Sequence, residues 1–170
     1  DRGVDPREAM LALIDEESNN VGVVGHNRIE SDVRFFMQYA NAMIGSDGRA
    51  ISPDGWWASD KPHPRFYGCY PRILGRYVRE DGVLPLEGAI YKMSGFPAKR
   101  LGLKDRGLIQ EGSVADLVVF DADTIIDHAD FDEPHQLSTG VSHVWVNGQA
   151  IISDGRHTGA RPGQVLRRGA

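Results

Sequence analysis

Hydrophobic positions in the amino-terminal third of the chain follow two different periods. Apolar residues recur at helical spacing in 4–18 and 30–41, whereas 20–25 and 42–47 contain short apolar runs bounded by glycine or polar residues. The first pattern predicts amphipathic helices, and the second predicts buried strands. The order helix, strand, helix, strand is typical of a parallel α/β fold, in which catalytic groups follow the carboxyl ends of strands.

Both predicted helices begin at residues that favour a helix start. Asp5 is the expected N-cap of the first helix, with Pro6 at its first helical position, and Ser31 is the expected N-cap of the second. The apolar positions at helical spacing are expected to face a core. They are Ala9, Met10, Leu13 and Ile14 in the first helix, and Val33, Phe36, Met37 and Ala40 in the second.

The middle of the chain combines a long aperiodic stretch with further helices. Residues 49–66 show no hydrophobic period and are rich in proline, glycine, tryptophan and charge. A loop of this length inside a compact unit is usually functional or disordered, and its aromatic side chains favour the functional interpretation. Helical spacing returns in 71–80 and in 86–103, and the latter is expected to break at Gly95 and Pro97.

The pattern changes to β near residue 104. Residues 112–121 predict a strand, and 141–155 predict a hairpin around Asn147-Gly148, a dipeptide typical of two-residue hairpin turns. The chain therefore divides into an α/β part, 1–103, and an all-β part, 104–170.

Composition narrows the classes of function. The 170 residues carry a net charge of −5 with no densely basic stretch, which argues against a nucleic-acid surface. No apolar run is long enough to cross a membrane. The one cysteine, Cys69, excludes an intrachain disulfide framework and favours a reducing compartment, so a cytoplasmic location is expected.

The segment "MIGSDG", residues 43–48, raises the question of catalysis. It leads an apolar run into Ser46 and Asp47, with Gly45 and Gly48 on either side. Asp-Gly is a frequent hairpin turn, which is one interpretation of the segment. The other is a catalytic carboxylate presented at the end of a parallel strand.

Several motifs together resemble a known family. The segments "GFPAKRLGL", "GLIQEGSVADLVVFD" and "VWVNGQAI" resemble the carboxyl-terminal part of the amidohydrolase superfamily. Within it, "MIGSDG", "KPHPRFYGCYPRILGRYVRE" and "GRHTGARPGQVLRR" are similar to the D-aminoacylases, also called N-acyl-D-amino-acid deacylases. The resemblance implies the last βα units of a metal-dependent (β/α)₈ barrel, followed by strands of a small β-sandwich.

The resemblance also implies roles for individual residues. Asp47 matches the general base of these zinc enzymes and is a possible metal ligand, whereas Asp116 matches a structural residue. A metal-assisted hydrolysis needs a carboxylate that removes a proton from water and returns it to the leaving amine. The expected products are a carboxylate and a free D-amino acid.

The motif "HPRFYG" suggests how such a substrate is held. His63, Arg65 and Tyr67 alternate, and an extended chain would place all three on one face. Arginine suits a bidentate grip on the α-carboxylate of an N-acyl amino acid, and Ser46 is assigned to the same substrate site. The alternative is that Arg65 is solvated and Tyr67 packs on the barrel. The other histidines, His128, His135, His143 and His157, are expected at the surface or in loops.

The metal ligands that the family draws from earlier strands have no counterpart here. The chain is therefore expected to be an incomplete fragment whose partners are an N-acyl-D-amino acid and the missing amino-terminal part of the barrel. Two alternatives stay open. One is another amidohydrolase, such as a dihydropyrimidinase-like cyclic amidase, and the other is a non-catalytic interaction module.

Overall fold

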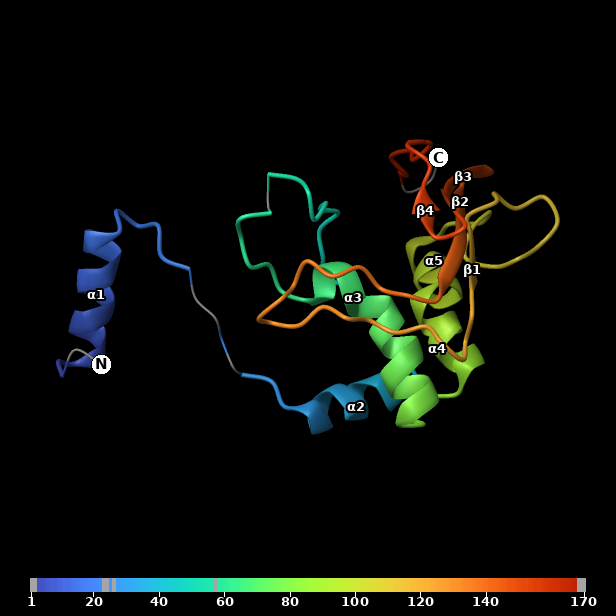
Figure 1. Ribbon diagram of the computed structural model, residues 1–170. Helices are drawn as coiled ribbons and strands as arrows, with labels where there is room; N and C mark the ends of the chain where they lie inside the picture. Colours follow the sequence, from blue (N-terminus) through green and yellow to red (C-terminus); the bar gives the residue numbers. More distant parts are fainter. Residues whose placement is uncertain (1–2, 23–24, 26, 57, 168–170) are drawn as a thin grey trace. The chain divides into compact units, whose positions relative to one another are not determined.

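The computed structural model describes residues 3–22, 25, 27–56 and 58–167, and it divides into two compact units (Figure 1). The units are Asp1–Glu30 and Ser31–Ala170. The elements in chain order are α1 (Pro6–Glu16), α2 (Glu30–Gln38), α3 (Arg65–Arg72), η1 (Ile73–Glu80), α4 (Leu86–Met93), α5 (Gly95–Leu101), β1 (Leu117–Phe120), β2 (Val141–Val146), β3 (Gln149–Ser153) and β4 (Arg156–His157). No helix in the described ranges is both long and apolar enough to span a membrane.

Helix α1 begins as the sequence predicts. The Asp5 carboxylate accepts a hydrogen bond from the backbone N–H of Arg7 at 2.9 Å, and Pro6 follows in the first turn. This bond satisfies one of the donors that a helix start leaves open. The predicted core face, however, is not buried. Met10 is 56% exposed, and no residue of α1 is buried.

The core of the larger unit lies where η1 and α4 pack against the residues that follow β1. Its buried members are Ile73, Leu74, Tyr77, Leu84, Ala89 and Ile125. Val33 and Met37 of α2 pack against this core, as predicted. Phe36 does not, because it is 62% exposed, and Ala40 lies exposed beyond the end of α2.

Helices α3 and η1 continue into one another (Figure 1). The predicted helix at 71–80 is present, but the helical segment begins earlier, at Arg65. Pro71 has no N–H to donate to the carbonyl of Tyr67, four residues before it, and that carbonyl instead accepts a hydrogen bond from Ser138 Oγ at 3.1 Å. After Pro71 the chain is wound as a π-helix, a form that is usually a single turn.

A long excursion between β1 and β2, residues 121–140, lies along α3 and η1; we call it the strap (orange in Figure 1). Ile126 and Thr139 pair across it in an antiparallel bridge. Two glycines of the helices allow the contact. A Cβ on Gly68 would lie 2.6 Å from Asp127 Cβ, and one on Gly75 would lie 2.5 Å from the carbonyl oxygen of Ile125. Only glycine permits so close an approach of the two backbones.

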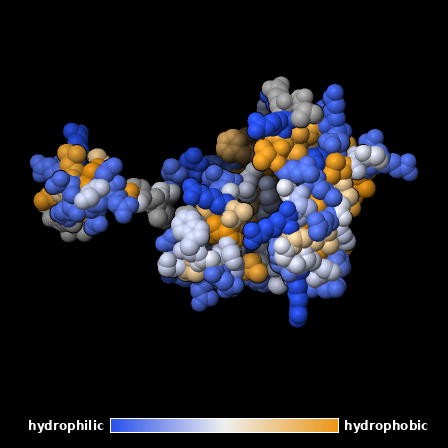
Figure 2. All heavy atoms as spheres, turned by 90° about the horizontal axis from the view of Figure 1, so that it is seen from above, coloured by the Kyte–Doolittle hydropathy of each residue, from blue (hydrophilic) through white to orange (hydrophobic). Residues whose placement is uncertain are grey.

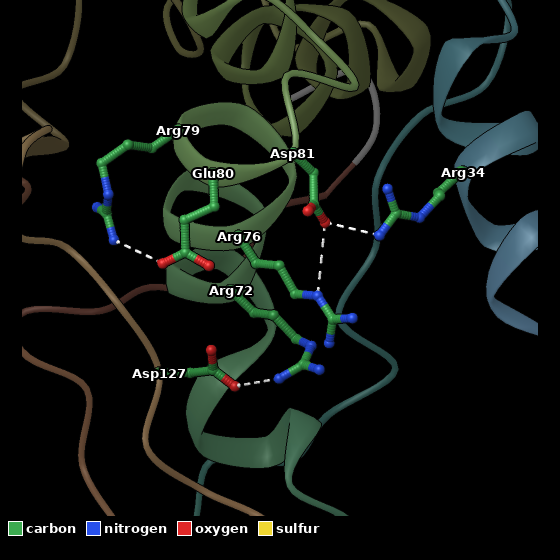
Figure 3. Close-up of polar contacts among 7 residues, drawn as sticks. All are labelled: Arg34, Arg72, Arg76, Arg79, Glu80, Asp81 and Asp127. Atoms are coloured by element: carbon green, nitrogen blue, oxygen red, sulfur yellow. Dashed lines mark hydrogen bonds and ion pairs between the residues drawn. The ribbon is translucent and has the colours of Figure 1, made fainter.

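Arginines of the helices hold the strap and α2 from the side (Figure 3). Arg72 Nη1 lies 3.0 Å from Asp127 Oδ2, and the Asp127 side chain is only 5% exposed. Asp81 Oδ2, at the end of η1, pairs with Arg34 of α2 at 2.7 Å and with Arg76 at 3.5 Å. These pairs connect α3 to the strap and α2 to the end of η1, segments that are distant in sequence.

The four strands form one antiparallel sheet in the order β1-β2-β3-β4. The hairpin predicted at 141–155 is confirmed, and Asn147 and Gly148 both adopt positive φ, at 49° and 76°, as its two-residue turn requires. The strand predicted at 112–121 begins later, at Leu117. The described residues form no second sheet, so the predicted sandwich is not confirmed.

Asp116 has the structural role that the sequence predicts. Its carboxylate accepts a hydrogen bond from the backbone N–H of Asn147 at 2.8 Å and pairs with Arg106, which also donates to Asn147 Oδ1 at 2.8 Å. Asn147 Nδ2 donates to the carbonyl of Pro162 at 2.7 Å. Both carboxylate oxygens of Asp116 thus hold the hairpin turn, one directly and one through Arg106.

The parallel strands predicted at 20–25 and 42–47 are not formed in the described residues. Residues 23 and 24 lie outside the described ranges, and 20–22 and 42–47 belong to no strand. A strand of a parallel sheet is defined by ladders to its neighbours, and these segments meet no neighbouring strand. The parallel strands predicted here are therefore not confirmed.

A buried lysine holds the second of these segments in place. Lys92 of α4 is 8% exposed, and its Nζ donates to the carbonyls of Tyr39 and Ala42 at 2.6 and 2.9 Å. The carbonyl of Lys92 accepts a hydrogen bond from the N–H of Ile44 at 3.1 Å. The ammonium therefore satisfies carbonyls just beyond the end of α2, a position that favours positive charge.

The contact at Gly75 predicts a sharp effect on stability. Gly75→Ala should lower the free energy of unfolding. Overpacking against the strap costs about 1–3 kcal/mol, whereas the higher helix propensity of alanine stabilises by at most about 1 kcal/mol. The measurement is urea denaturation of the chain. Gly163→Ala is the control, since a Cβ at Gly163 meets nothing within 4 Å. A Gly75→Ala variant as stable as the control would contradict the close contact of strap and helix.

Candidate functional site

Asp47 lies in a turn with an unusual backbone. Its φ is 46°, in the left-handed region that few residues other than glycine adopt. The N–H of Gly48 donates to Ser46 Oγ at 3.2 Å, which closes the turn from the other side. The Asp47 side chain is 86% exposed, so its carboxylate is presented outward. The predicted strand end is thus a loop, but it presents the carboxylate as expected.

Arg65 holds Asp47 at two points. Arg65 Nε donates to the carbonyl oxygen of Asp47 at 2.9 Å, and Nη2 lies 2.9 Å from Oδ2 of the same residue. The first bond secures the left-handed backbone and the second orients the carboxylate. A guanidinium carries further donors, including both on Nη1, that this grip does not use. Arg65 can therefore bind a second anion beside Asp47.

His63 organises the start of α3. Its Nδ1 accepts the backbone N–H of Arg65 at 3.1 Å, one of the donors left open at a helix start, and its ring meets Phe131 of the strap edge-on at 5.1 Å. An acceptor Nδ1 requires the proton on Nε2. Burial lowers the pKa of His63, the Arg65 guanidinium lowers it further, and Asp47 opposes both. His63 is therefore neutral in this role.

The structure corrects the predicted geometry of "HPRFYG". The motif is not extended, because Pro64 adopts helical angles and α3 begins at Arg65. Successive residues of an α-helix are rotated by about 100°, so Arg65 and Tyr67 point in nearly opposite directions. Arg65 contacts Asp47, which follows Ser46, and His63 accepts the N–H of Arg65. Tyr67 is directed elsewhere.

Tyr67 contacts the strap through His135, one of the histidines expected at the surface or in loops. Tyr67 Oη lies 2.9 Å from His135 Nδ1, and His135 Nε2 lies 2.7 Å from the carbonyl oxygen of Asp60. Burial, and then the negative charge of Asp54, raises the pKa of Tyr67, so its hydroxyl keeps its proton. His135 stands alone in the sequence, 68 residues from Tyr67, and no local motif marks it.

The described residues do not form a metal site on their own. The described residues contain no group of three or more His, Cys, Asp or Glu side chains that could hold a metal ion. Asp47 offers one carboxylate, whereas catalytic zinc sites use three protein ligands. Cys69 packs against the core, and its Sγ approaches the carbonyl of Gly45 at 3.9 Å. Burial raises the pKa of this thiol, so it is a packing residue, as expected.

A family model decides the relationship. The model described as "Amidohydrolase family" matches residues 50–152, more than half of the chain. This chain belongs to the amidohydrolase family. The match spans helices α3 to α5, the strap and most of the sheet, so it includes "HPRFYG" but begins just after Asp47.

Individual relatives confirm the resemblance to D-aminoacylases. An N-acyl-D-glutamate deacylase of Alcaligenes xylosoxydans xylosoxydans is 46% identical over 141 residues, which are 83% of this chain and 27% of that protein. A D-aminoacylase of the same organism is 43% identical, over 83% of this chain and 28% of that protein. A solved structure of an N-acyl-D-glutamate deacylase from Bordetella bronchiseptica, complexed with zinc and a phosphonate inhibitor, is 42% identical, with a TM-score of 0.69 over 82% of this chain and 28% of that one. The chain thus spans just over a quarter of the length of these relatives.

The lowered pKa of His63 predicts a pH dependence of stability. Below about pH 6.5 the unfolded chain binds a proton at this residue more readily than the folded chain does. The free energy of unfolding should therefore rise with pH between the folded and the unfolded pKa of His63. Acidification through the same window should lower it. His63→Asn keeps an acceptor for the Arg65 N–H but does not titrate, so its unfolding free energy should depend less steeply on pH.

Urea midpoints between about pH 5 and 8 measure this slope, in the range where histidines titrate. His157→Asn is the control, since His157 accepts a similar bond from Gly159 at 2.9 Å in the exposed strand β4. Equal slopes for wild type and His63→Asn would show that His63 does not hold the helix start in its neutral form.

Proposed function

We propose that this chain is the carboxyl-terminal part of a zinc-dependent deacylase that hydrolyses N-acyl-D-amino acids to a carboxylate and a D-amino acid. The observation that carries the proposal is the pair of Asp47 and Arg65. Arg65 holds the exposed Asp47 carboxylate and the Asp47 carbonyl, and its guanidinium keeps further N–H groups that these two contacts do not use. The relatives that act on N-acyl-D-amino acids supply the substrate class.

Asp47 is the proposed general acid and base. Amide hydrolysis requires that water lose a proton as it attacks the carbonyl carbon and that the leaving nitrogen gain one as the C–N bond breaks. A single exposed carboxylate performs both transfers in turn. Zinc, when bound, would polarise the amide carbonyl and acidify the attacking water. Its ligands other than Asp47 are proposed to lie in other parts of the enzyme.

Arg65 is the proposed anchor for the α-carboxylate of the substrate, with Ser46 and His63 beside it. The substrate class carries this carboxylate by definition, and a planar guanidinium binds it bidentately. The contacts with Asp47 leave N–H groups of Arg65 for that purpose. One guanidinium would then hold both the proposed base, Asp47, and the α-carboxylate of the substrate. Tyr67 is proposed to border the site through the loop that it helps to hold, since its hydroxyl faces His135.

Exposed apolar side chains support the proposal that further protein covers this chain. Hydrophobic residues reach the surface in both units (orange in Figure 2). On and beside α2, the large apolar side chains of Ile29, Phe35, Phe36 and Tyr39 are 57–65% exposed. We propose that the amino-terminal part of a (β/α)₈ barrel packs against them. The free Cys69 supports a cytoplasmic location for the enzyme.

The alternatives have less support. A cyclic amidase does not require an anchor for a free α-carboxylate, whereas Arg65 offers one beside Asp47. A non-catalytic module does not require a left-handed aspartate held at two points, a conformation that costs free energy and persists where its surroundings enforce it.

Asp47→Asn tests the proposed function in the full-length enzyme. The change keeps size and shape but removes the basic oxygen, so kcat should fall by about 10²–10⁴-fold, with little change in thermal midpoint. N-acetyl-D-glutamate is the substrate, measured by release of free amine. Asp123→Asn, at an exposed position in the strap, is the control. Near-normal turnover of Asp47→Asn would show that the residue merely forms a turn, because asparagine also suits that backbone.

The isolated chain should not retain zinc. The described residues supply no cluster of ligands, and a tight site needs three or four of them. Elemental analysis after dialysis against zinc-free buffer measures the bound metal, with the full-length enzyme dialysed in parallel. Stoichiometric zinc in the isolated chain would overturn the proposed division of ligands.

A further inference from the structure

His135 connects three segments that are far apart in sequence. Its ring lies between Tyr67 of α3 and the backbone of Asp60, near the end of the loop 49–64 that precedes α3. The rings of Tyr67 and His135 meet edge-on at 5.7 Å. The residue itself belongs to the strap, which Ser138 also ties to the Tyr67 carbonyl. A single imidazole thus joins the loop, the helix and the strap.

The two contacts of His135 determine where its proton lies. Asp60 contributes a carbonyl oxygen, which can only accept, so Nε2 must be the donor. In the neutral ring Nδ1 is then the acceptor, and the Tyr67 hydroxyl donates to it. This assignment follows from the hydrogen-bond network. Each ring nitrogen therefore has one partner and one role.

We propose that His135 is a positioning residue that holds the end of the loop 49–64 against α3 through the Asp60 carbonyl. The proposal rests on the proposed function, in which this loop borders the substrate. The loop begins just after Asp47, which Arg65 holds, and it ends just after Asp60, which His135 holds. Side chains of α3 thus secure both ends of the loop, one directly and one through His135.

The hold on the loop does not depend on the charge of His135. Nε2 donates to Asp60 whether the ring is neutral or protonated. On protonation Nδ1 also becomes a donor, and the Tyr67 oxygen accepts from it, so this second bond reverses its direction without breaking. Tyr67 of α3 faces this ring, and the charge of Asp54 in the loop acts on Tyr67. The loop should therefore be held with either form of the ring.

A matched pair of substitutions tests the proposal in the full-length enzyme. His135→Gln places an amide donor near the position of Nε2 and can keep the Asp60 bond. His135→Asn places its polar atoms near Nδ1, so it can keep the Tyr67 bond but loses Asp60. Chymotryptic cleavage after Trp56, a loop residue that is 81% exposed, reports how firmly the loop is held. His135→Asn and His135→Ala should be cleaved about tenfold faster than wild type, and His135→Gln at nearly the wild-type rate, between about pH 5 and 8.

Kinetics connect the loop to the substrate. With N-acetyl-D-glutamate, His135→Asn should raise KM about tenfold with a smaller change in kcat, and His135→Gln should restore KM. If His135→Asn and His135→Gln changed KM and the cleavage rate equally, and in proportion to their loss of thermal midpoint, the proposal would be overturned in favour of a general packing role. Cleavage of His135→Asn at the wild-type rate would also overturn it. An inactive wild-type enzyme would refute the proposed function, while the cleavage rates would still decide the role of His135.

Discussion

The close contact between the strap and the α3–η1 helices is the constraint on which the rest of the larger unit depends. Gly68 and Gly75 lie two turns apart on one side of these helices, and each admits the backbone or Cβ of the strap to a distance that any side chain would prevent. Asp127 is then buried against Arg72, where a carboxylate without a partner would be costly. The core residue Ile125 is placed by the same contact.

This contact also explains how the site residues come together. The strap brings Phe131 to His63 and His135 to Tyr67, so the first turn of α3 is supported from outside the helix. Arg65 lies in that turn, and its two bonds to Asp47 reach back across the loop. The geometry of the Asp47 carboxylate thus depends on packing between segments that are more than sixty residues apart in sequence.

Local features were predictable from the sequence, and those that depend on distant segments were not. The Asp5 cap, the Asn147-Gly148 turn and the break between α4 and α5 follow from residues within a few positions of each other. The parallel strands do not, because a strand requires neighbouring strands that the described chain does not supply. His135 was missed for the same reason. Its partners are a tyrosine and a carbonyl that no sequence spacing connects.

Asp47 and Arg65 were singled out by their chemistry, and they lie together although the backbone predicted around them was wrong. Asp47 was expected at a strand end and lies instead in a left-handed turn, while Arg65 was expected in extended chain and lies instead in a helix. Both geometries bring a carboxylate and a guanidinium together, but only the helix explains why Tyr67 turns away from them. Two residues apart on α3, Arg65 holds the Asp47 carboxylate and Tyr67 contacts His135 of the strap. The motif therefore binds two separate segments of the chain.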